Sequence, residues 1–201
     1  MSEINKWDER YATDDFAYGT EPNDFLRENI QHLPAGGRIL CLAEGEGRNA
    51  VFLARHGFNV VAVDSSTVGL QKAQKLADEN GVQITTIVAD LAEFTIADSS
   101  FDGVISIFCH LPPAVRSRLH RQVIDGLKIG GTLILEGYTP EQLHQGTGGP
   151  PVKELMMTLT TVQDDFRDLN QIHLLETTRE ILEGTLHTGT GAVVQFIGEK
   201  I

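Results

Sequence analysis

A glycine-containing acidic turn carries the clearest chemical signal in the chain. Residues 45–50 read GEGRNA, which fits the G-x-G-x-x-A pattern, and Asp64 lies 19 residues after Gly45. In such a turn the glycines at 45 and 47 let the backbone approach a ligand, and an acidic residue at that distance accepts both ribose hydroxyls. The pattern predicts an adenosine ligand bound by Gly45, Gly47 and Asp64. A turn required only by strand–helix geometry is the alternative.

The charges on this turn favour one adenosine ligand over another. Glu44 and Glu46 flank Gly45. A dinucleotide would place its pyrophosphate over the turn, where like charges about 4 Å apart cost about 4 kcal/mol at an effective dielectric constant of about 20. S-adenosylmethionine has no phosphate, and its ammonium and sulfonium groups suit an acidic turn. Glu44 and Glu46 therefore favour S-adenosylmethionine over a nicotinamide dinucleotide.

A second acidic position follows a later apolar run. Asp90 and Leu91 come directly after residues 84–88, and Ser65 stands beside Asp64 after residues 59–63. Because ligands of open parallel sheets bind outside the carboxyl ends of the strands, we expect these positions to share one cleft. Asp90 is placed to accept from an adenine amino group; a helix cap or turn residue is the alternative.

Few residues are candidates for chemistry beyond cofactor binding. The reaction that S-adenosylmethionine supports, methyl transfer, is an in-line displacement. It needs alignment of the nucleophile, the methyl group and the sulfur, and exclusion of water, more than it needs a base. His110, two residues past Phe108, is the nearest candidate to orient an acceptor or take its proton, against the alternative of an ordinary loop histidine. Tyr138, and Trp7 with Tyr11 on one helical face, are candidates for the substrate pocket, with packing as the alternative.

These positions require a sheet whose strand ends meet. Short apolar runs alternate with helix-like segments, which is typical of a doubly wound, mostly parallel α/β sheet of the Rossmann-like kind. Strands are expected at 38–43, 59–63, 84–88, 101–108 and 132–138, and helices at 49–56, 66–80 and 112–127.

The C-terminal part breaks this alternation. Residues 152–168 are amphipathic and expected to be partly helical, and 172–186 and 192–197 are expected to be strands joined through 187–191. A short connection with glycine favours an antiparallel hairpin at the sheet edge, which brings the sheet to seven strands. No low-complexity linker interrupts the chain, so we expect one domain over residues 1–201.

Composition excludes several classes of partner. The chain has 201 residues and a formal net charge of −12, which disfavours nucleic acid and anionic membrane surfaces. Two cysteines, scattered histidines and no long apolar run predict no disulfide framework, no metal site and no membrane span. The N-terminus lacks a secretory pattern, so we expect a cytoplasmic protein.

Several motifs together resemble the class I S-adenosylmethionine-dependent methyltransferases. Residues 40–49 (LCLAEGEGRN) look like the first motif of that family, and 101–102, 127–131 (LKIGG) and the terminal hairpin fit its later motifs. The segments 7–11 (WDERY) and 18–22 (YGTEP) are similar to the small-molecule branch that contains tellurite-resistance and thiopurine methyltransferases.

The resemblance implies roles for individual residues. It implies that Gly45 and Gly47 approach the methionine moiety, that Asp64 holds the ribose, and that Asp90 and Leu91 hold adenine. It further implies that Phe108 borders the sulfonium and that Tyr18 covers the cofactor from a helical lid over residues 1–34. The chain departs from the family at Cys41, where an acid is common, and at Ala43, where glycine is common.

The expected function is methyl transfer from S-adenosylmethionine to a small molecule, with a soft sulfur, selenium or tellurium nucleophile favoured. Such acceptors arrive deprotonated or nearly so, and no catalytic base is then required. Two alternatives stay open on the residues alone. One is a nicotinamide-dependent oxidoreductase, favoured by the G-x-G-x-x-A match, and the other is a noncatalytic module that binds an adenosine ligand.

Overall fold

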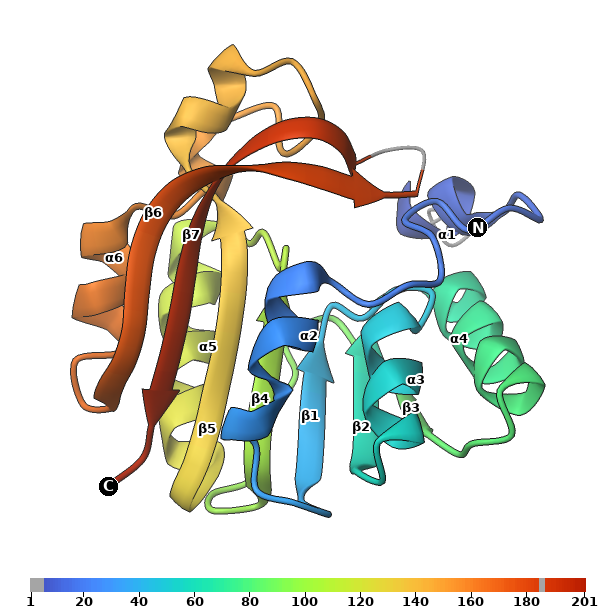
Figure 1. Ribbon diagram of the computed structural model, residues 1–201, viewed down its shortest axis with the longest axis horizontal. Helices are drawn as coiled ribbons and strands as arrows, with labels where there is room; N and C mark the ends of the chain where they lie inside the picture. Colours follow the sequence, from blue (N-terminus) through green and yellow to red (C-terminus); the bar gives the residue numbers. More distant parts are fainter. Residues whose placement is uncertain (1–5, 185–186) are drawn as a thin grey trace.

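A seven-stranded sheet organises the chain in the computed structural model, which describes residues 6–184 and 187–201. The strands are β1 (Arg38–Leu42), β2 (Asn59–Asp64), β3 (Thr85–Val88), β4 (Phe101–Ile107), β5 (Leu127–Tyr138), β6 (Asn170–Glu183) and β7 (His187–Glu199). Their order is β3-β2-β1-β4-β5-β7-β6 (Figure 1). The pairs among β1 to β5 are parallel, and β7 is antiparallel to both its neighbours. The predicted doubly wound sheet with an antiparallel C-terminal hairpin is confirmed.

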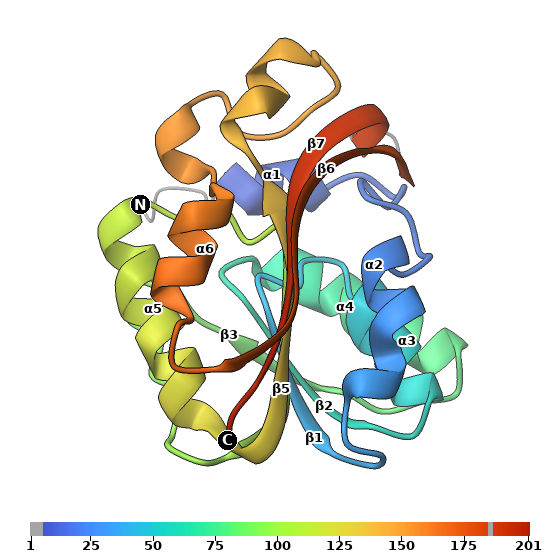
Figure 2. The same ribbon diagram turned by 60° about the vertical axis from the view of Figure 1, so that its left-hand side comes forward.

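Helices cover both faces of this sheet. They are α1 (Lys6–Tyr11), α2 (Asp24–Asn29), α3 (Arg48–Arg55), α4 (Thr67–Glu79), α5 (Pro113–Gly126) and α6 (Leu159–Asp165), with 3-10 turns at Ile30–His32, Pro140–His144 and Lys153–Leu155. Helices α2, α3 and α4 lie on one face, and α5 and α6 lie on the other (Figure 2). The helical part of the predicted amphipathic segment 152–168 is the 3-10 turn and α6.

The period-two pattern of the strands builds two cores. In β1, Ile39 and Cys41 pack in the cluster under α2, α3 and α4, whereas Leu40 and Leu42 pack in the cluster under α5 and α6. Successive side chains of a strand point to opposite faces, so a run that is apolar at every position must be covered on both sides. The crossovers then bring the carboxyl ends of β1, β2, β3 and β4 to one edge.

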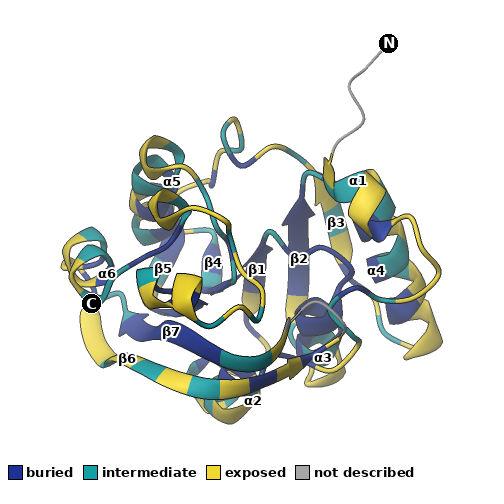
Figure 3. Cartoon of the chain, turned by 90° about the horizontal axis from the view of Figure 1, so that it is seen from above, coloured by how far each residue is buried: buried dark blue, intermediate teal, exposed yellow. Residues whose placement is uncertain are grey.

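The two N-terminal helices have different positions. Helix α2 packs on the sheet, with Leu26 fully buried, and its N-cap Asn23 accepts a hydrogen bond from the Leu26 amide at 3.0 Å. Helix α1 lies away from the sheet, beside α4 (Figure 3). Of the expected lid over 1–34, therefore, residues 24–33 form part of the sheet's cover, and residues 1–5 lie outside the described residues.

The C-terminal hairpin reaches beyond the sheet. Strands β6 and β7 curve across the carboxyl-end edge toward the N-terminal segment (Figure 1). A Cβ atom on Gly184 would lie 2.5 Å from the Ala17 carbonyl oxygen, so glycine allows this backbone contact. The predicted connection through 187–191 is wrong, because these residues are paired with β6 and belong to β7. The predicted end of the first hairpin strand, Leu186, lies outside the described residues.

Candidate active site

A cavity of about 720 Å³ lies at the carboxyl ends of the parallel strands. Its wall combines the end of β1 with the ends of β2 and β4, the N-terminal segment and the loop between β5 and α6. Most of the residues predicted for the site line it: Trp7, Tyr11, Tyr18, Glu44, Glu46, Asp64, Ser65, Asp90, Leu91, Phe108 and His110. Gly45, Gly47 and Tyr138 do not, and each of these differences has a packing reason.

The two glycines of the turn serve packing inside the protein. Gly45 and Gly47 have φ of 62° and 92°, in the left-handed region that favours glycine. A Cβ atom on Gly45 would lie 2.7 Å from the Tyr11 hydroxyl, and one on Gly47 would lie 2.5 Å from the Ala73 Cβ. Tyr11 therefore covers the turn, and α4 packs tightly behind it. The role that the resemblance gives both glycines, at the methionine moiety, stays a prediction.

Asp64 is held in place by the turn that it faces. Its Oδ2 accepts from the Gly45 amide at 2.9 Å, and its Oδ1 accepts from the Ser66 amide at 2.8 Å. Burial raises the pKa of Asp64, although the amide hydrogen bonds favour the carboxylate. Each carboxylate oxygen has a second acceptor direction, so Asp64 can still receive hydroxyl groups from the cavity.

Glu44 and Glu46 have partners within the protein. Glu44 accepts from the Ala50 amide at 2.7 Å, and burial raises its pKa to about 7. Glu46 accepts from the Ala17 amide at 2.8 Å and pairs with the Lys72 ammonium at 2.5 Å. Because Lys72 neutralises Glu46, the turn repels a pyrophosphate less than two unpaired carboxylates would. Glu46 also ties the N-terminal segment to the turn.

Asp90 and Leu91 form the end of the cavity beyond β3. Asp90 is exposed, and its Oδ1 accepts from the Ala92 amide at 2.8 Å, as in a turn-forming aspartate. Leu91 is 5% exposed and packs in the core under α5. The pair therefore presents one acidic and one apolar group side by side.

Two strand ends at the cavity have unusual backbone angles. Ala43 after β1 and Phe108 after β4 have φ of 50° and 51°. Left-handed backbone at a residue other than glycine costs free energy, and such residues gather at functional sites. Ala43 and Phe108 both line the cavity. The sequence identified Phe108 as a site residue, but it gave no sign that the two neighbouring strands end in the same strained geometry.

Three rings are stacked beside the cavity. The Phe108 and Tyr138 ring centroids are 4.6 Å apart, and those of His110 and Tyr138 are 5.5 Å apart. Tyr138 is 1% exposed, so it lies behind the wall as a support and not in the pocket that was predicted for it. His110 Nδ1 lies 3.1 Å from the Leu155 carbonyl oxygen. That oxygen only accepts, so Nδ1 is the donor in this contact.

The N-terminal segment brings aromatic rings over the cavity. Trp7 and Tyr11 are stacked with centroids 6.0 Å apart, and Tyr18 meets Tyr11 edge-on at 6.3 Å. Asp8 anchors this segment, because its carboxylate accepts from the Ser66 hydroxyl at 2.6 Å. Arg10 donates to the Tyr18 hydroxyl at 2.9 Å.

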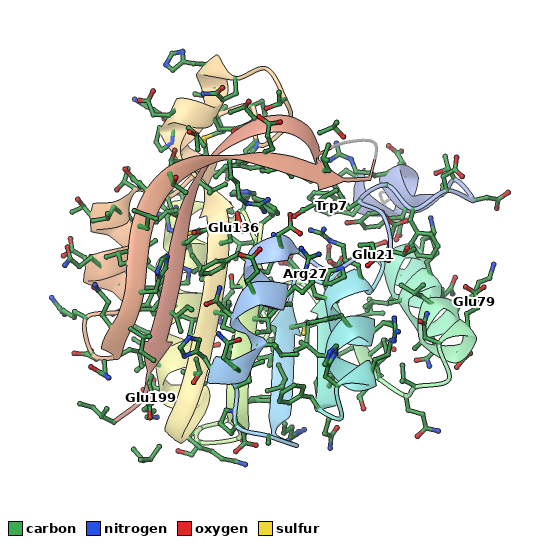
Figure 4. All side chains as sticks on the ribbon, in the orientation of Figure 1. Trp7, Glu21, Arg27, Glu79, Glu136 and Glu199 are labelled. Atoms are coloured by element: carbon green, nitrogen blue, oxygen red, sulfur yellow. The ribbon has the colours of Figure 1, made fainter. Side chains whose placement is uncertain are left out.

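A buried polar network beside the cavity was missed in the sequence. Glu136 in β5, which lies beneath the hairpin (Figure 4), accepts from Arg179 Nε at 2.7 Å and from the Asn23 side chain at 3.1 Å. Glu183 in β6 accepts from Asn23 at 2.9 Å and from Arg48 Nη2 at 2.6 Å. The members of this network are far apart in sequence. The only local signal for it was an acid inside the apolar run of β5.

The loop after β5 supplies another unpredicted wall. Its run 146–151 (GTGGPP) was identified only as a loop, yet residues 148–151 and Leu155 line the cavity. Within residues 6–184 and 187–201, no cluster of three or more histidine, cysteine or acidic residues is positioned to hold a metal ion. In the same residues, no helix has both the length and the apolar character needed to cross a bilayer.

Comparison with known proteins identifies the fold and its family. Residues 39–131 match a family described as "Methyltransferase domain". A tRNA (uracil(54)-C(5))-methyltransferase of Pyrococcus horikoshii is 31% identical over 112 residues, which are 49% of this chain and 27% of that protein. The chain therefore spans about a quarter of the length of that relative.

Solved structures extend the likeness to most of the chain. The protein solved for "Conversion of a Disulfide Bond into a Thioacetal Group during Echinomycin Biosynthesis" has a TM-score of 0.75 and 16% identity, over 96% of this chain and 90% of that one. A SAM-dependent methyltransferase of Methanosarcina mazei has a TM-score of 0.69 and 18% identity, over 90% and 99%. S-adenosylmethionine is the cofactor that the matched family and this fold imply. Residues 39–131 match a methyltransferase domain, and the whole chain has the fold of S-adenosylmethionine-dependent methyltransferases.

Proposed function

We propose that this protein transfers a methyl group from S-adenosylmethionine to a small acceptor, with a soft sulfur, selenium or tellurium nucleophile favoured. The observation that carries the proposal is the cavity itself. Its acidic groups lie at the ends of β1, β2 and β3, its aromatic wall lies at the end of β4, and α1 covers it. A volume of about 720 Å³ lies within the usual range for small ligands.

The residues present fit the cofactor in their chemistry. Asp64 keeps acceptor directions for ribose hydroxyls, and Asp90 beside Leu91 offers an acceptor and an apolar surface for adenine. Glu44 and the ring of Phe108 lie on the wall where a cationic group would be stabilised. When bound, the cofactor supplies a methyl group on an already activated carbon. The protein then has to align the acceptor with it and exclude water.

The walls of the cavity support a small acceptor. Trp7 and Tyr18 cover one side, and the loop 148–155 closes another. His110 also lines the cavity, with Nδ1 on the Leu155 carbonyl oxygen. A solved relative named for thioacetal formation also supports sulfur chemistry in this fold. A net charge of −12 opposes nucleic acid as the substrate, although the tRNA methyltransferase relative acts on it.

Thermal unfolding with excess S-adenosylmethionine, S-adenosylhomocysteine, NAD or NADP tests the cofactor. A ligand at about 100 times its Kd stabilises the folded state by about 2.7 kcal/mol. We expect stabilisation by the two adenosyl-sulfur compounds alone, followed by methylation of a thiol or selenol in an acceptor screen. Stabilisation by a dinucleotide would instead support the oxidoreductase. Cofactor binding without methylation of any thiol, selenol, amine or phenol would support a binding module.

A further inference from the structure

Arg48 connects the cofactor turn to the hairpin. It is the first residue of α3, its side chain is 9% exposed, and it lines the cavity. Nη2 donates to Glu183 at 2.6 Å. Nη1 is buried and has no hydrogen-bond partner among the described residues. One arm of the guanidinium is therefore fixed by the protein, while the other has a donor that nothing in the described chain satisfies.

A buried donor without a partner is costly, and charged donors cost the most. The guanidinium fork has a rigid geometry that suits two separate acceptors at once. Glu183 holds one arm of Arg48, so the direction of the second arm is fixed by the first. Because Arg48 lines the cavity, a molecule that enters beneath the N-terminal segment can supply the acceptor that Nη1 lacks.

The neighbouring charges of the network are already compensated. Arg179 pairs with Glu136 at 2.7 Å and with Glu183 at 3.2 Å, and Asn23 donates to both carboxylates. Lys72 likewise forms an ion pair with Glu46. The second arm of Arg48 thus stands out from its surroundings, because the other cations near it have their acceptors within the protein.

The N-terminal segment adds two more cations to the cavity wall. Lys6 and Arg10 line the cavity, lie over the Trp7 ring at 5.5 and 5.0 Å, and form no ion pair with any described residue. The acids that face the cavity lie around the turn and at the ends of β2 and β3. The cavity wall therefore carries cations as well as acids, in a chain with a net charge of −12.

We propose that the methyl acceptor is an anion whose carboxylate binds Nη1 of Arg48, with Lys6 and Arg10 attracting it to the cavity. This inference rests on the proposed function, because it names the chemical class of that acceptor. The cofactor's own carboxylate is a different partner. A contact of Arg48 with that carboxylate would instead weaken the binding of S-adenosylhomocysteine, which is measured separately below.

The test compares one thiol with and without its charge. Binding of 3-mercaptopropionate and of its methyl ester is measured by titration calorimetry, with and without S-adenosylhomocysteine, for wild type and Arg48→Gln. We expect the Kd of the carboxylate to rise about 10- to 100-fold in Arg48→Gln, which is the range for a lost charge-assisted hydrogen bond. The Kd values of the ester and of S-adenosylhomocysteine should change less than about threefold.

Two further variants guard against a general effect of the substitution. Arg48→Lys keeps a charge for Glu183 but not the fork, so we expect an intermediate loss and a native circular dichroism spectrum. Arg121→Gln removes an exposed cation of α5 and should change nothing. Equal losses for acid and ester, or no loss for the acid, would overturn the inference. So would a tenfold weaker S-adenosylhomocysteine complex, because Arg48 would then hold the cofactor.

Turnover separates this inference from the proposed function. With S-adenosylmethionine, we expect wild type to methylate the carboxylate thiol with at least a tenfold higher kcat/KM than the ester. In Lys6→Gln/Arg10→Gln this preference should become smaller and less sensitive to salt. If neither thiol is methylated, methyl transfer to thiols fails, and the binding experiment still decides whether Arg48 recognises a carboxylate.

Discussion

The two ends of the cavity are built in different ways. The turn region, residues 43–50 with Asp64, is held by local hydrogen bonds: Glu44 bonds a residue six positions away, and Asp64 bonds one 19 positions away. The arch region, which comprises residues 6–19, loop 148–155 and the hairpin tip, depends on the network beside it. There Asn23 bonds residues 113 and 160 positions away. The turn region is thus local in sequence, whereas the arch region exists only after the whole chain has folded.

This difference predicts where each region is vulnerable. In the turn region a lost side chain removes a ligand contact while the strands and helix around it remain. In the arch region a lost side chain leaves buried charges without partners, because Glu136 and Glu183 share Arg179 and Asn23. The first kind of change should affect binding more than folding, and the second kind should affect folding first.

The largest effect is expected for Glu136→Ala, in the buried network on which the arch region depends. Removing one partner of a buried ion pair costs about 3–5 kcal/mol, because the remaining charge is left uncompensated. Arg179 would lose two hydrogen bonds to Glu136. Urea unfolding measures the loss, with the exposed Glu141→Ala as the control. A loss under about 1 kcal/mol would mean that the network does not hold the hairpin in place.

Asp64→Ala should have its main effect on the cofactor. We expect S-adenosylmethionine to bind about 100-fold more weakly, since two hydrogen bonds to a charged acceptor are lost. Circular dichroism should remain native, because the strand around Asp64 is covered on both faces. Titration calorimetry measures the affinity, and Asp78→Ala, on the exposed side of α4, is the matched control. Affinity kept within a factor of two would remove Asp64 from the cofactor site.

A smaller, pH-dependent effect is expected for Glu44→Gln. In the folded protein the pKa of Glu44 is about 7, above its ordinary value of 4.5. Folding therefore favours the neutral form of Glu44. Its contribution to the stability of the folded state is complete below pH 4.5 and is lost as the pH rises through 7. Glutamine stays neutral, so Glu44→Gln should stabilise the protein by about 2 kcal/mol at pH 8 and by little at pH 5. Thermal melts at both pH values check this. An equal shift at both would contradict the raised pKa.

The sequence predicted features held by neighbouring residues, as in the turn region, better than features that depend on distant contacts, as in the arch region. The parallel strands and the turn after β1 depend on neighbouring residues, and the structure has them within a few positions. The hairpin connection at 187–191 was wrong, and Tyr138, expected at the substrate pocket, is buried behind the cavity wall. Both depend on how far the hairpin extends and curves, and glycine within 187–191 allows a strand as well as a turn.

The sequence by itself determined the order of the elements, the edge at which the strand ends meet and the acidic turn with Asp64. Each of these follows from short-range periodicity and turn chemistry. Only the tertiary structure decided that Gly45 lies under Tyr11, that Lys72 neutralises Glu46 and that Arg48 has one arm on Glu183. The physical reason is that such partners are set by which surfaces the crossovers and the arching hairpin bring together.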